Sequence, residues 1–256
     1  MRVEVIEPHG FCAGVERALR LAHTTLSDSP PPVCCLHEIV HNETVVQELA
    51  AKGMRFVESV EEVPTGAVML ISAHGTSPAN RAAAERRRVK IVDATCPFVA
   101  AAHATIRTNF KKGMRTVVIG APTHAEVRGY LGEPGACLPE DVKPGERTGR
   151  VIQTTFDAGA HDGVCTATRD RQQAVRDFVA AHQSGAIGVL VVGSAKSANT
   201  GRLAEIAEQS GAQTWRIASS HEIKGCDFSC VDILGVTAGA STPEETLQDV
   251  LWVLKT

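Results

Sequence analysis

Short apolar runs rich in Val and Ile alternate with helical patterns along the whole chain. The apolar runs predict strands at Val3–Ile6, Pro32–Leu36, Ala67–Ser72, Lys90–Asp93, Thr116–Ile119, Arg150–Gln153, Val189–Val192, Thr214–Ile217 and Ile233–Thr237. Helical periodicity predicts helices at Val15–Leu26, Glu43–Lys52, Val99–Lys111, Gln172–His182, Gly201–Gln209 and Pro243–Leu254. Continuous apolar strands separated by amphipathic helices are typical of parallel sheets covered on both faces. The pattern therefore predicts an α/β fold made of several small units.

Small and functional residues follow nearly every predicted strand, just before the next helix. Examples are HGFCAGVER at 9–17, SAHGTSPAN at 72–80, DATCPFV at 93–99 and GSAKSANTGRL at 193–203. Ligands of open α/β sheets bind at the carboxyl ends of strands, where helix N-termini suit phosphate. The candidate chemistry therefore gathers at one edge of the fold.

Composition excludes several classes of function. The net charge is −3 and aromatic residues make up 4% of the chain, which argues against a nucleic-acid surface. No window approaches the ~20 apolar residues of a membrane span. The N-terminus MRVEVIEPHG has no apolar segment of the kind found in secretion signals. We therefore expect a cytoplasmic protein with reduced thiols and no membrane partner.

Three of the eight cysteines share one setting. Cys12, Cys96 and Cys165 each follow a predicted strand and precede a predicted helix, where the helix dipole stabilises a thiolate. Their wide spacing does not match a local zinc motif and favours one ligand from each of three α/β units. Three ligands would leave one iron of a cubane cluster open to substrate. The alternative interpretation is three unrelated buried thiols.

The other cysteines favour simpler roles. Cys34 and Cys35 lie within a predicted strand, which favours packing. Cys137 falls in the Pro/Gly-rich segment 132–149, which is typical of a surface loop. Cys226 and Cys230 form a CxxxC pair, for which a second metal site is a minor alternative.

Histidines and small polar residues at strand ends predict an anion site. His41, His74 and His124 stand beside helix starts, and protonated imidazoles donate charge-assisted hydrogen bonds to phosphate oxygens. Ser197, Asn199 and Ser241 would add neutral donors. No Walker-type loop and no GxGxxG is present, so the donors suit a compact diphosphate rather than a nucleotide. Taken alone, each histidine is more often a structural group than a ligand.

Glu126 is the candidate proton donor. It follows His124 by two residues, and a carboxylate in such a pocket can supply a proton to a reductive step. The alternative is an ordinary glutamate at a helix start, where the dipole stabilises it.

These motifs together resemble one known family. GFCAGVERA, HEIVHN, SAHGTSP, DATCPFV, HAEV, QTT, CTATRDRQ and GVTAGAS are similar, in this order, to the loops of 4-hydroxy-3-methylbut-2-enyl diphosphate reductases, the IspH or LytB family. The resemblance runs from the first predicted strand to the last predicted helix. It implies three α/β units in pseudo-threefold arrangement around a central iron–sulfur cluster. The units would be 13–95, a shortened 96–161, and 162–256 together with 1–12.

The resemblance also implies a reaction and its residues. A [4Fe–4S] cluster would be held by Cys12, Cys96 and Cys165, with one open iron for the substrate hydroxyl. The diphosphate would be bound at positions that match His41, His74, His124, Ser197, Asn199 and Ser241. Glu126 and Thr154 match the family's proton-relay residues. The products of two-electron reductive dehydroxylation would be isopentenyl and dimethylallyl diphosphate, with electrons from ferredoxin or flavodoxin.

The chain departs from the family pattern at four places. Ala198 stands where a second serine is usual, and Ala125 where proline is usual. The stretch from Thr155 to Cys165 and the tail after Trp252 are short. Three alternatives follow: a divergent paralogue with another phosphorylated allylic substrate, a non-catalytic iron–sulfur redox sensor, and a zinc-stabilised binding module.

Overall fold

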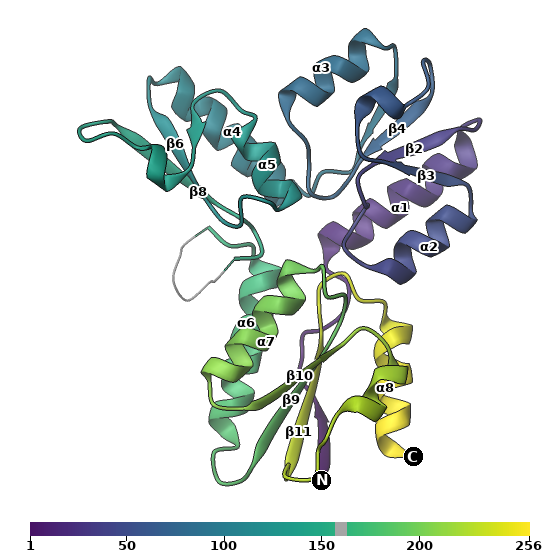
Figure 1. The fold of residues 1–256 in the computed structure, drawn as a ribbon, viewed down its shortest axis with the longest axis vertical. Coiled ribbons are helices and arrows are strands. Elements are labelled where there is room, and N and C mark those ends of the chain that lie inside the picture. Colours follow the sequence, from purple (N-terminus) through teal and green to yellow (C-terminus); the bar gives the residue numbers. More distant parts are fainter. Residues whose placement is uncertain (157–162) are drawn as a thin grey trace. The chain divides into compact units, whose positions relative to one another are not determined.

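The computed structural model describes residues 1–156 and 163–256, and every statement below concerns these residues. They divide into two compact units. The first contains Met1–Cys12, His41–Glu43 and Thr155–Thr256, and the second contains Ala13–Val40 and Thr44–Thr154. Figure 1 shows their helices and strands, and we describe each unit by itself.

The first unit is built on one four-stranded parallel sheet in the order β1-β11-β9-β10. Its strands are β1 (Arg2–Val5), β9 (Ile187–Val192), β10 (Gln213–Ile217) and β11 (Ile233–Ala238). Its helices are α6 (Thr166–Ala181), α7 (Ala198–Gln209), α8 (Glu244–Lys255) and the 3-10 helix η3 (Ser220–Gly225).

Alternation along β9 explains why this sheet is covered on both faces. Val189 and Val191 pack with α6 and α7, while Leu190 and Val192 pack with α8. Successive side chains of a strand point to opposite faces, so an unbroken apolar strand needs an apolar layer on each side. The loops at the carboxyl ends of these strands are left to carry polar residues.

The second unit contains two parallel sheets. One has the order β3-β2-β4-β5, with β2 (Val33–Leu36), β3 (Met54–Val57), β4 (Val68–Ile71) and β5 (Lys90–Asp93). Its helices are α1 (Ala13–Asp28), α2 (Glu43–Ala51), α3 (Pro78–Arg86) and the 3-10 helix η1 (Val60–Glu62). Ala84 of α3 packs with Cys34, Met69 and Ile71 on one face of this sheet.

The other sheet of this unit has the order β7-β6-β8. Its strands are β6 (Arg115–Ile119), β7 (Ala136–Cys137) and β8 (Thr148–Ile152). Its helices are α4 (Pro97–Lys111), α5 (Ala125–Leu131) and the 3-10 helix η2 (Pro139–Asp141). Val99 and Ile106 of α4 and Val127 and Tyr130 of α5 share a core with the strands of this sheet.

The α/β class and the parallel sheets confirm the prediction from the sequence. No predicted range covers β3, β7, α3 or α5, although helix starts were expected beside His74 and His124, just before α3 and α5. The expectation that Cys137 lies in a surface loop was wrong, because it belongs to β7 and is buried. The division into 13–95, 96–161 and 162–256 with 1–12 stays a prediction. Among the described residues, no helix is long and apolar enough to span a membrane.

Candidate functional site

The three candidate ligand cysteines all stand at helix starts. Cys12 directly precedes α1, and Cys96 and Cys165 are the N-cap residues of α4 and α6. All three are half-buried, and none of the eight cysteines is in a disulfide. The Cys165 sulfur accepts the Thr168 backbone N–H at 3.4 Å. Each of the three cysteines therefore lies at a strand-to-helix junction, which is the setting that the sequence predicts.

A buried arginine lies beside two of these cysteines in the first unit. Arg171 of α6 is 4% exposed and donates to the Ala167 and Gly10 carbonyls at 2.9 and 2.8 Å. Burial lowers the pKa of its guanidinium, while the charges of Cys12 and Cys165 oppose that shift. Its Nε has no hydrogen-bond partner among the described residues. A buried cation with an open donor fits a negatively charged group held by these two cysteines.

The start of α7 carries two candidate anion-binding residues of the first unit. Ser197 is the N-cap, and its hydroxyl accepts the Thr200 N–H at 3.3 Å. Asn199 is only 3% exposed, and neither its amide nitrogen nor its amide oxygen has a partner in the described part of the chain. A buried amide without partners costs free energy, so such groups in native proteins are commonly met by a ligand or water.

Two further candidates of this unit meet directly. The Ser241 hydroxyl donates to the His41 carbonyl at 3.1 Å. This bond ties the segment His41–Glu43 to the loop after β11, although 200 residues separate the two in sequence. The sequence predicted both residues as candidates, but it contains no signal for their contact.

The second unit brings His74 and His124 together. Their rings lie edge to face with centroids 5.5 Å apart. His124 is the N-cap of α5, where its Nδ1 accepts the Glu126 N–H at 3.2 Å. Gly75 beside His74 has a φ of +73°, and a Cβ there would lie 3.2–3.3 Å from Thr95, Val99 and His103. Glycine adopts this backbone with the least strain and brings no Cβ into this crowded space, so a substitution of Gly75 should disturb the loop that carries His74.

Glu126 is buried and hydrogen-bonded to Tyr130 on its own helix and to Thr154 just after β8. It is 2% exposed, and its Oε1 accepts the Thr154 N–H at 2.6 Å. Its Oε2 accepts the Thr154 hydroxyl at 2.9 Å, and the Tyr130 hydroxyl donates to Oε1 at 2.9 Å. Burial raises the pKa of Glu126, and the hydrogen bonds from Thr154 and Tyr130 act against it. A carboxyl group with a raised pKa keeps its proton to a higher pH than an ordinary glutamate, which suits a proton donor.

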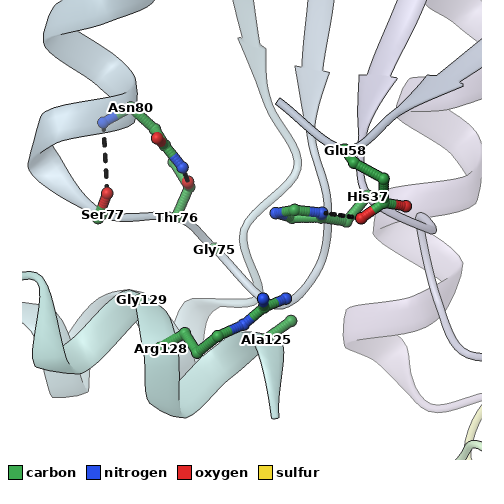
Figure 2. A pocket seen from close by; sticks show the side chains of 9 residues that line it. All are labelled: His37, Glu58, Gly75, Thr76, Ser77, Asn80, Ala125, Arg128 and Gly129. Carbon is green, nitrogen blue, oxygen red and sulfur yellow. Dashed lines mark hydrogen bonds and ion pairs between the residues drawn. The ribbon is translucent and has the colours of Figure 1, made fainter. Parts of the chain in front are cut away.

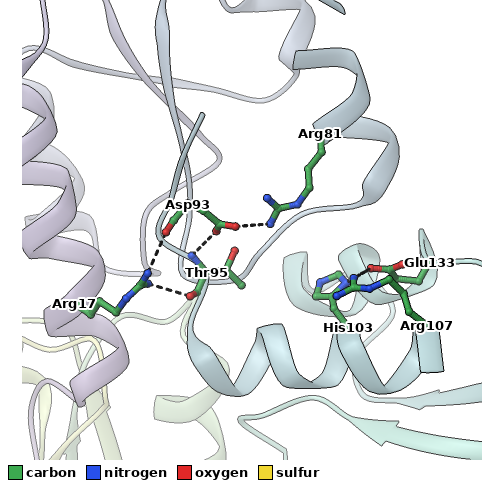
Figure 3. A network of polar contacts seen from close by, with 7 residues as sticks. All are labelled: Arg17, Arg81, Asp93, Thr95, His103, Arg107 and Glu133. Atoms are coloured by element: carbon green, nitrogen blue, oxygen red, sulfur yellow. Dashed lines mark hydrogen bonds and ion pairs between the residues drawn. The ribbon is translucent and has the colours of Figure 1, made fainter. Parts of the chain in front are cut away.

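Behind Glu126 lies a buried polar cluster that sequence reasoning missed. His103 of α4 contacts Tyr130 edge to face at 5.0 Å, and its Nδ1 lies 2.8 Å from Glu133 Oε1. Arg107 donates to the same oxygen at 2.6 Å (Figure 3). Burial lowers the pKa of His103, with Glu133 opposing. The four-residue spacing of Glu126 and Tyr130 on a helix is the signal that could have revealed their contact.

The loop before Cys96 is fixed by two arginines. Arg17 of α1 donates to the Thr95 and Asp93 carbonyls at 3.1 and 3.2 Å (Figure 3). Arg81 pairs with the Asp93 carboxylate at 2.8 Å, and that carboxylate accepts the Thr95 N–H at 2.9 Å. These contacts lower the pKa of Asp93 against the effect of its burial. The cysteine thus follows a rigid strand end.

A cavity of about 250 Å³ opens in the second unit beside the loops that carry His74 and His124. It is lined by His37, Glu58, Gly75, Thr76, Ser77, Asn80, Ala125, Arg128 and Gly129 (Figure 2). Gly75 and Ala125 are the sequence neighbours of His74 and His124. None of the predicted site residues lines the cavity itself.

Cys34 and Cys35 have the packing role that the sequence favours, whereas Cys230 does not pack in the core. Cys34 and Cys35 are buried in β2, and burial raises the pKa of both thiols. Cys226 follows η3 and its thiol lies 3.8 Å from the Glu222 carbonyl. Cys230 is exposed.

Comparisons with known proteins give one consistent result. The family model described as "LytB protein" matches residues 3–160 and 140–255. The chain is 38% identical over 288 aligned positions to a 4-hydroxy-3-methylbut-2-enyl diphosphate reductase of Glaesserella parasuis, covering 100% of this chain and 90% of the relative. It is 37% identical to the protein of the same name from Baumannia cicadellinicola, with the same coverage.

Two solved structures are also similar. One is the E-1-hydroxy-2-methyl-but-2-enyl-4-diphosphate reductase of Plasmodium falciparum, with a TM-score of 0.93 and 27% identity. It is matched over 100% of this chain and 88% of that chain. The other is an (E)-4-hydroxy-3-methyl-but-2-enyl diphosphate reductase described as the terminal enzyme of the non-mevalonate pathway, with a TM-score of 0.69 and 30% identity. That match covers 100% of this chain and 99% of the other.

Proposed function

The chain belongs to the LytB family, and we propose that it is a 4-hydroxy-3-methylbut-2-enyl diphosphate reductase of non-mevalonate isoprenoid biosynthesis. The observation that carries this proposal is similarity to such reductases over the entire chain. In the reaction, the allylic C–O bond of the substrate breaks, its oxygen leaves as water, and a C–H bond forms. Two electrons and two protons are consumed, and the products are isopentenyl and dimethylallyl diphosphate.

We propose that Cys12, Cys96 and Cys165 hold a [4Fe–4S] cluster with one open iron. When bound, such a cluster supplies the electrons and an iron that coordinates the substrate hydroxyl. Three half-buried thiols at helix starts and the open donor of buried Arg171 support this assignment. The pseudo-threefold arrangement of three units around that cluster is part of the same proposal.

We further propose that a set of polar side chains recognises the substrate diphosphate. The proposed set is His41, His74, His124, Ser197, Asn199 and Ser241. The unpartnered amide of Asn199 supports it most directly, because a phosphate oxygen would satisfy the amide nitrogen. The Ser197 N-cap and the N-terminus of α7 add the positive end of a helix dipole.

Glu126 and Thr154 would move the proton. A protonated Glu126 can donate through Oε2 to the Thr154 hydroxyl, which can pass a proton onward by rotating. Burial keeps the carboxyl protonated above the usual pH range of a glutamate and also keeps bulk water away. We further propose a cytoplasmic location, supported by eight cysteines without a disulfide, and ferredoxin or flavodoxin as electron donor.

An anaerobic assay tests the function. Cluster-replete protein with reduced methyl viologen should convert the substrate to both products, whereas no isoprenyl product would refute the proposal. Cys165→Ser should lose iron and activity together. Cys226→Ser is the matched control, since Cys226 is also half-buried and outside any disulfide, and it should keep both.

A second candidate is a paralogue with the same chemistry and another phosphorylated allylic substrate. The absent hydroxyl at Ala198, in the first turn of α7, favours it. A substrate panel decides between the two. If another allylic diphosphate exceeds hydroxymethylbutenyl diphosphate in kcat/KM, the paralogue is correct.

A further inference from the structure

Tyr130 is the single tyrosine of the chain and is fully buried. It lies four residues after Glu126 on α5, so both side chains fall on one face of the helix. Its hydroxyl donates to Glu126 Oε1 at 2.9 Å. No motif of the sequence points to this residue, and none of the proposed roles above uses it.

The two oxygens of Glu126 have different partners. Oε1 accepts both the Thr154 backbone N–H, at 2.6 Å, and the Tyr130 hydroxyl. Oε2 accepts the Thr154 hydroxyl at 2.9 Å. A backbone N–H can only donate, whereas a threonine hydroxyl can donate or accept. Oε1 thus accepts hydrogen bonds from two donors. The partner of Oε2, the Thr154 hydroxyl, can either donate to that oxygen or accept a hydrogen bond from it.

We propose that Tyr130 is a positioning residue that assigns the acidic proton of Glu126 to Oε2, the oxygen that faces Thr154. With Tyr130 and the Thr154 N–H both donating to Oε1, a proton on that oxygen would displace one of them and leave a buried donor unpaired. A proton on Oε2 needs only a rotation of the Thr154 hydroxyl. This inference deepens the proposed function and rests on Glu126 being its proton donor.

The polar cluster behind Tyr130 holds the ring in place. The His103 ring lies edge to face on Tyr130, and His103 is itself fixed by Glu133, which is 2% exposed and also paired with Arg107. A Cβ on Gly129 would lie 3.5 Å from His103 Nε2, so the helix packs closely on this imidazole. A ring confined in this way cannot swing its hydroxyl to another acceptor.

The titratable side chains that lie near Glu126 come from α5, from its N-cap and from α4. They are His124 at the N-cap of α5, Tyr130 on the same helix, and His103 on α4. The interactions that oppose the effect of burial on Glu126 come from Thr154 and Tyr130. Removing the Tyr130 hydroxyl therefore removes a stabiliser of the ionised carboxylate while leaving the Thr154 contacts.

Tyr130→Phe tests the role in turnover. The variant removes one oxygen and keeps the ring against His103, so iron content and circular dichroism should match the wild type. We expect kcat to fall about tenfold, which corresponds to the free energy of one lost hydrogen bond to a charged group, with little change in KM. The alkaline limb of the kcat profile should move to higher pH, since the carboxyl group loses a donor that stabilises its ionised form. An unchanged kcat and pH profile in an active enzyme would overturn the proposal.

A measurement that does not depend on turnover uses the uniqueness of the tyrosine. In holoenzyme labelled with ¹³C at tyrosine Cζ, the single tyrosine signal should show a pH step as Glu126 ionises, and the step should vanish in Glu126→Gln. Absence of any Glu126-dependent step overturns the inference. Failure of the proposed function looks different: wild-type protein would form no isoprenyl product, whatever the NMR signal shows.

Discussion

The first turns of α7 and α5 each contain a buried polar side chain. The two side chains differ in whether they have hydrogen-bond partners. Asn199 of α7 is 3% exposed, and its amide meets no partner among the described residues. Glu126 of α5 is 2% exposed and receives hydrogen bonds from Thr154 and Tyr130 on both oxygens. Each helix start belongs to a different compact unit.

Under the proposed function, this difference separates two kinds of residue. A group that must bind a ligand is left open, and the protein bears the cost of an unpaired buried amide until the ligand arrives. A group that must exchange a proton is held in one orientation by the protein, and its burial adjusts the pKa. Substitutions at the two helices should therefore affect different quantities.

The largest expected effect is that of Glu126→Gln. The amide keeps the shape and cannot supply a proton, so kcat should fall by roughly 10²- to 10⁴-fold while substrate still binds. The raised pKa of Glu126 sets the sign of the pH dependence: wild-type activity should be lost as pH rises through that pKa. Stopped-flow and steady-state assays over a pH series measure both quantities.

A matched control for this substitution is Glu245→Gln. Glu245 is likewise the second residue of its helix, α8, and is exposed. It should leave kcat unchanged. Wild-type function in Glu126→Gln would instead support a non-catalytic iron–sulfur protein, the redox sensor considered from the sequence.

The sequence predicted the strands and helices whose apolar residues follow a regular period. β9 and β11 are unbroken apolar runs, and the prediction for Lys90–Asp93 matched β5 at both ends. Periodicity gave no range for α3, whose buried contribution is one small residue, Ala84. It gave none for α5 either, which is short and contains Gly129, a poor helix former, although a helix start was expected beside His124.

The candidate site was predictable to the extent that motifs mark it. Cysteines at helix starts follow from local pattern, and so do His124 and Glu126. Tyr130, His103 and Glu133 carry no motif, and the His103–Glu133 contact joins residues 30 apart in sequence. Such contacts are determined by how α4 and α5 pack on β6 and β8, which periodicity alone does not specify. The shortened stretch before Cys165 lies partly outside the described residues.

Asn199→Ala should separate binding from stability. Losing one hydrogen bond to a charged phosphate costs about 1.5–3 kcal/mol, so KM should rise roughly ten- to a hundredfold with kcat little changed. Because the amide has no partner in the described structure, the melting temperature of ligand-free protein should not fall.

Asn109→Ala is the control for that prediction. The Asn109 amide donates to the Thr116 hydroxyl at 3.0 Å, so this variant should lose about 1 kcal/mol of stability and keep its KM. If Asn199→Ala loses stability and keeps the wild-type KM, the amide is structural and the contrast between the two helix starts fails.

The smallest effect is expected from Ala198→Ser. Ala198 is the first residue of α7 and half-buried, next to the Ser197 N-cap, so a hydroxyl there adds one donor without disturbing the helix. If α7 binds the diphosphate, KM for hydroxymethylbutenyl diphosphate should fall by up to about tenfold, because a single added hydrogen bond rarely recovers its full value in a site built without it. Steady-state kinetics with this substrate and with longer allylic diphosphates measure the change.

A lower KM for every diphosphate means that the serine contacts the phosphates, as the unpartnered amide at this helix start predicts. An unchanged KM for all of them would mean that α7 offers its ligand only Ser197 and Asn199. A loss confined to the longer substrates would identify the small side chain at position 198 as an adaptation to a larger ligand, which is the paralogue hypothesis.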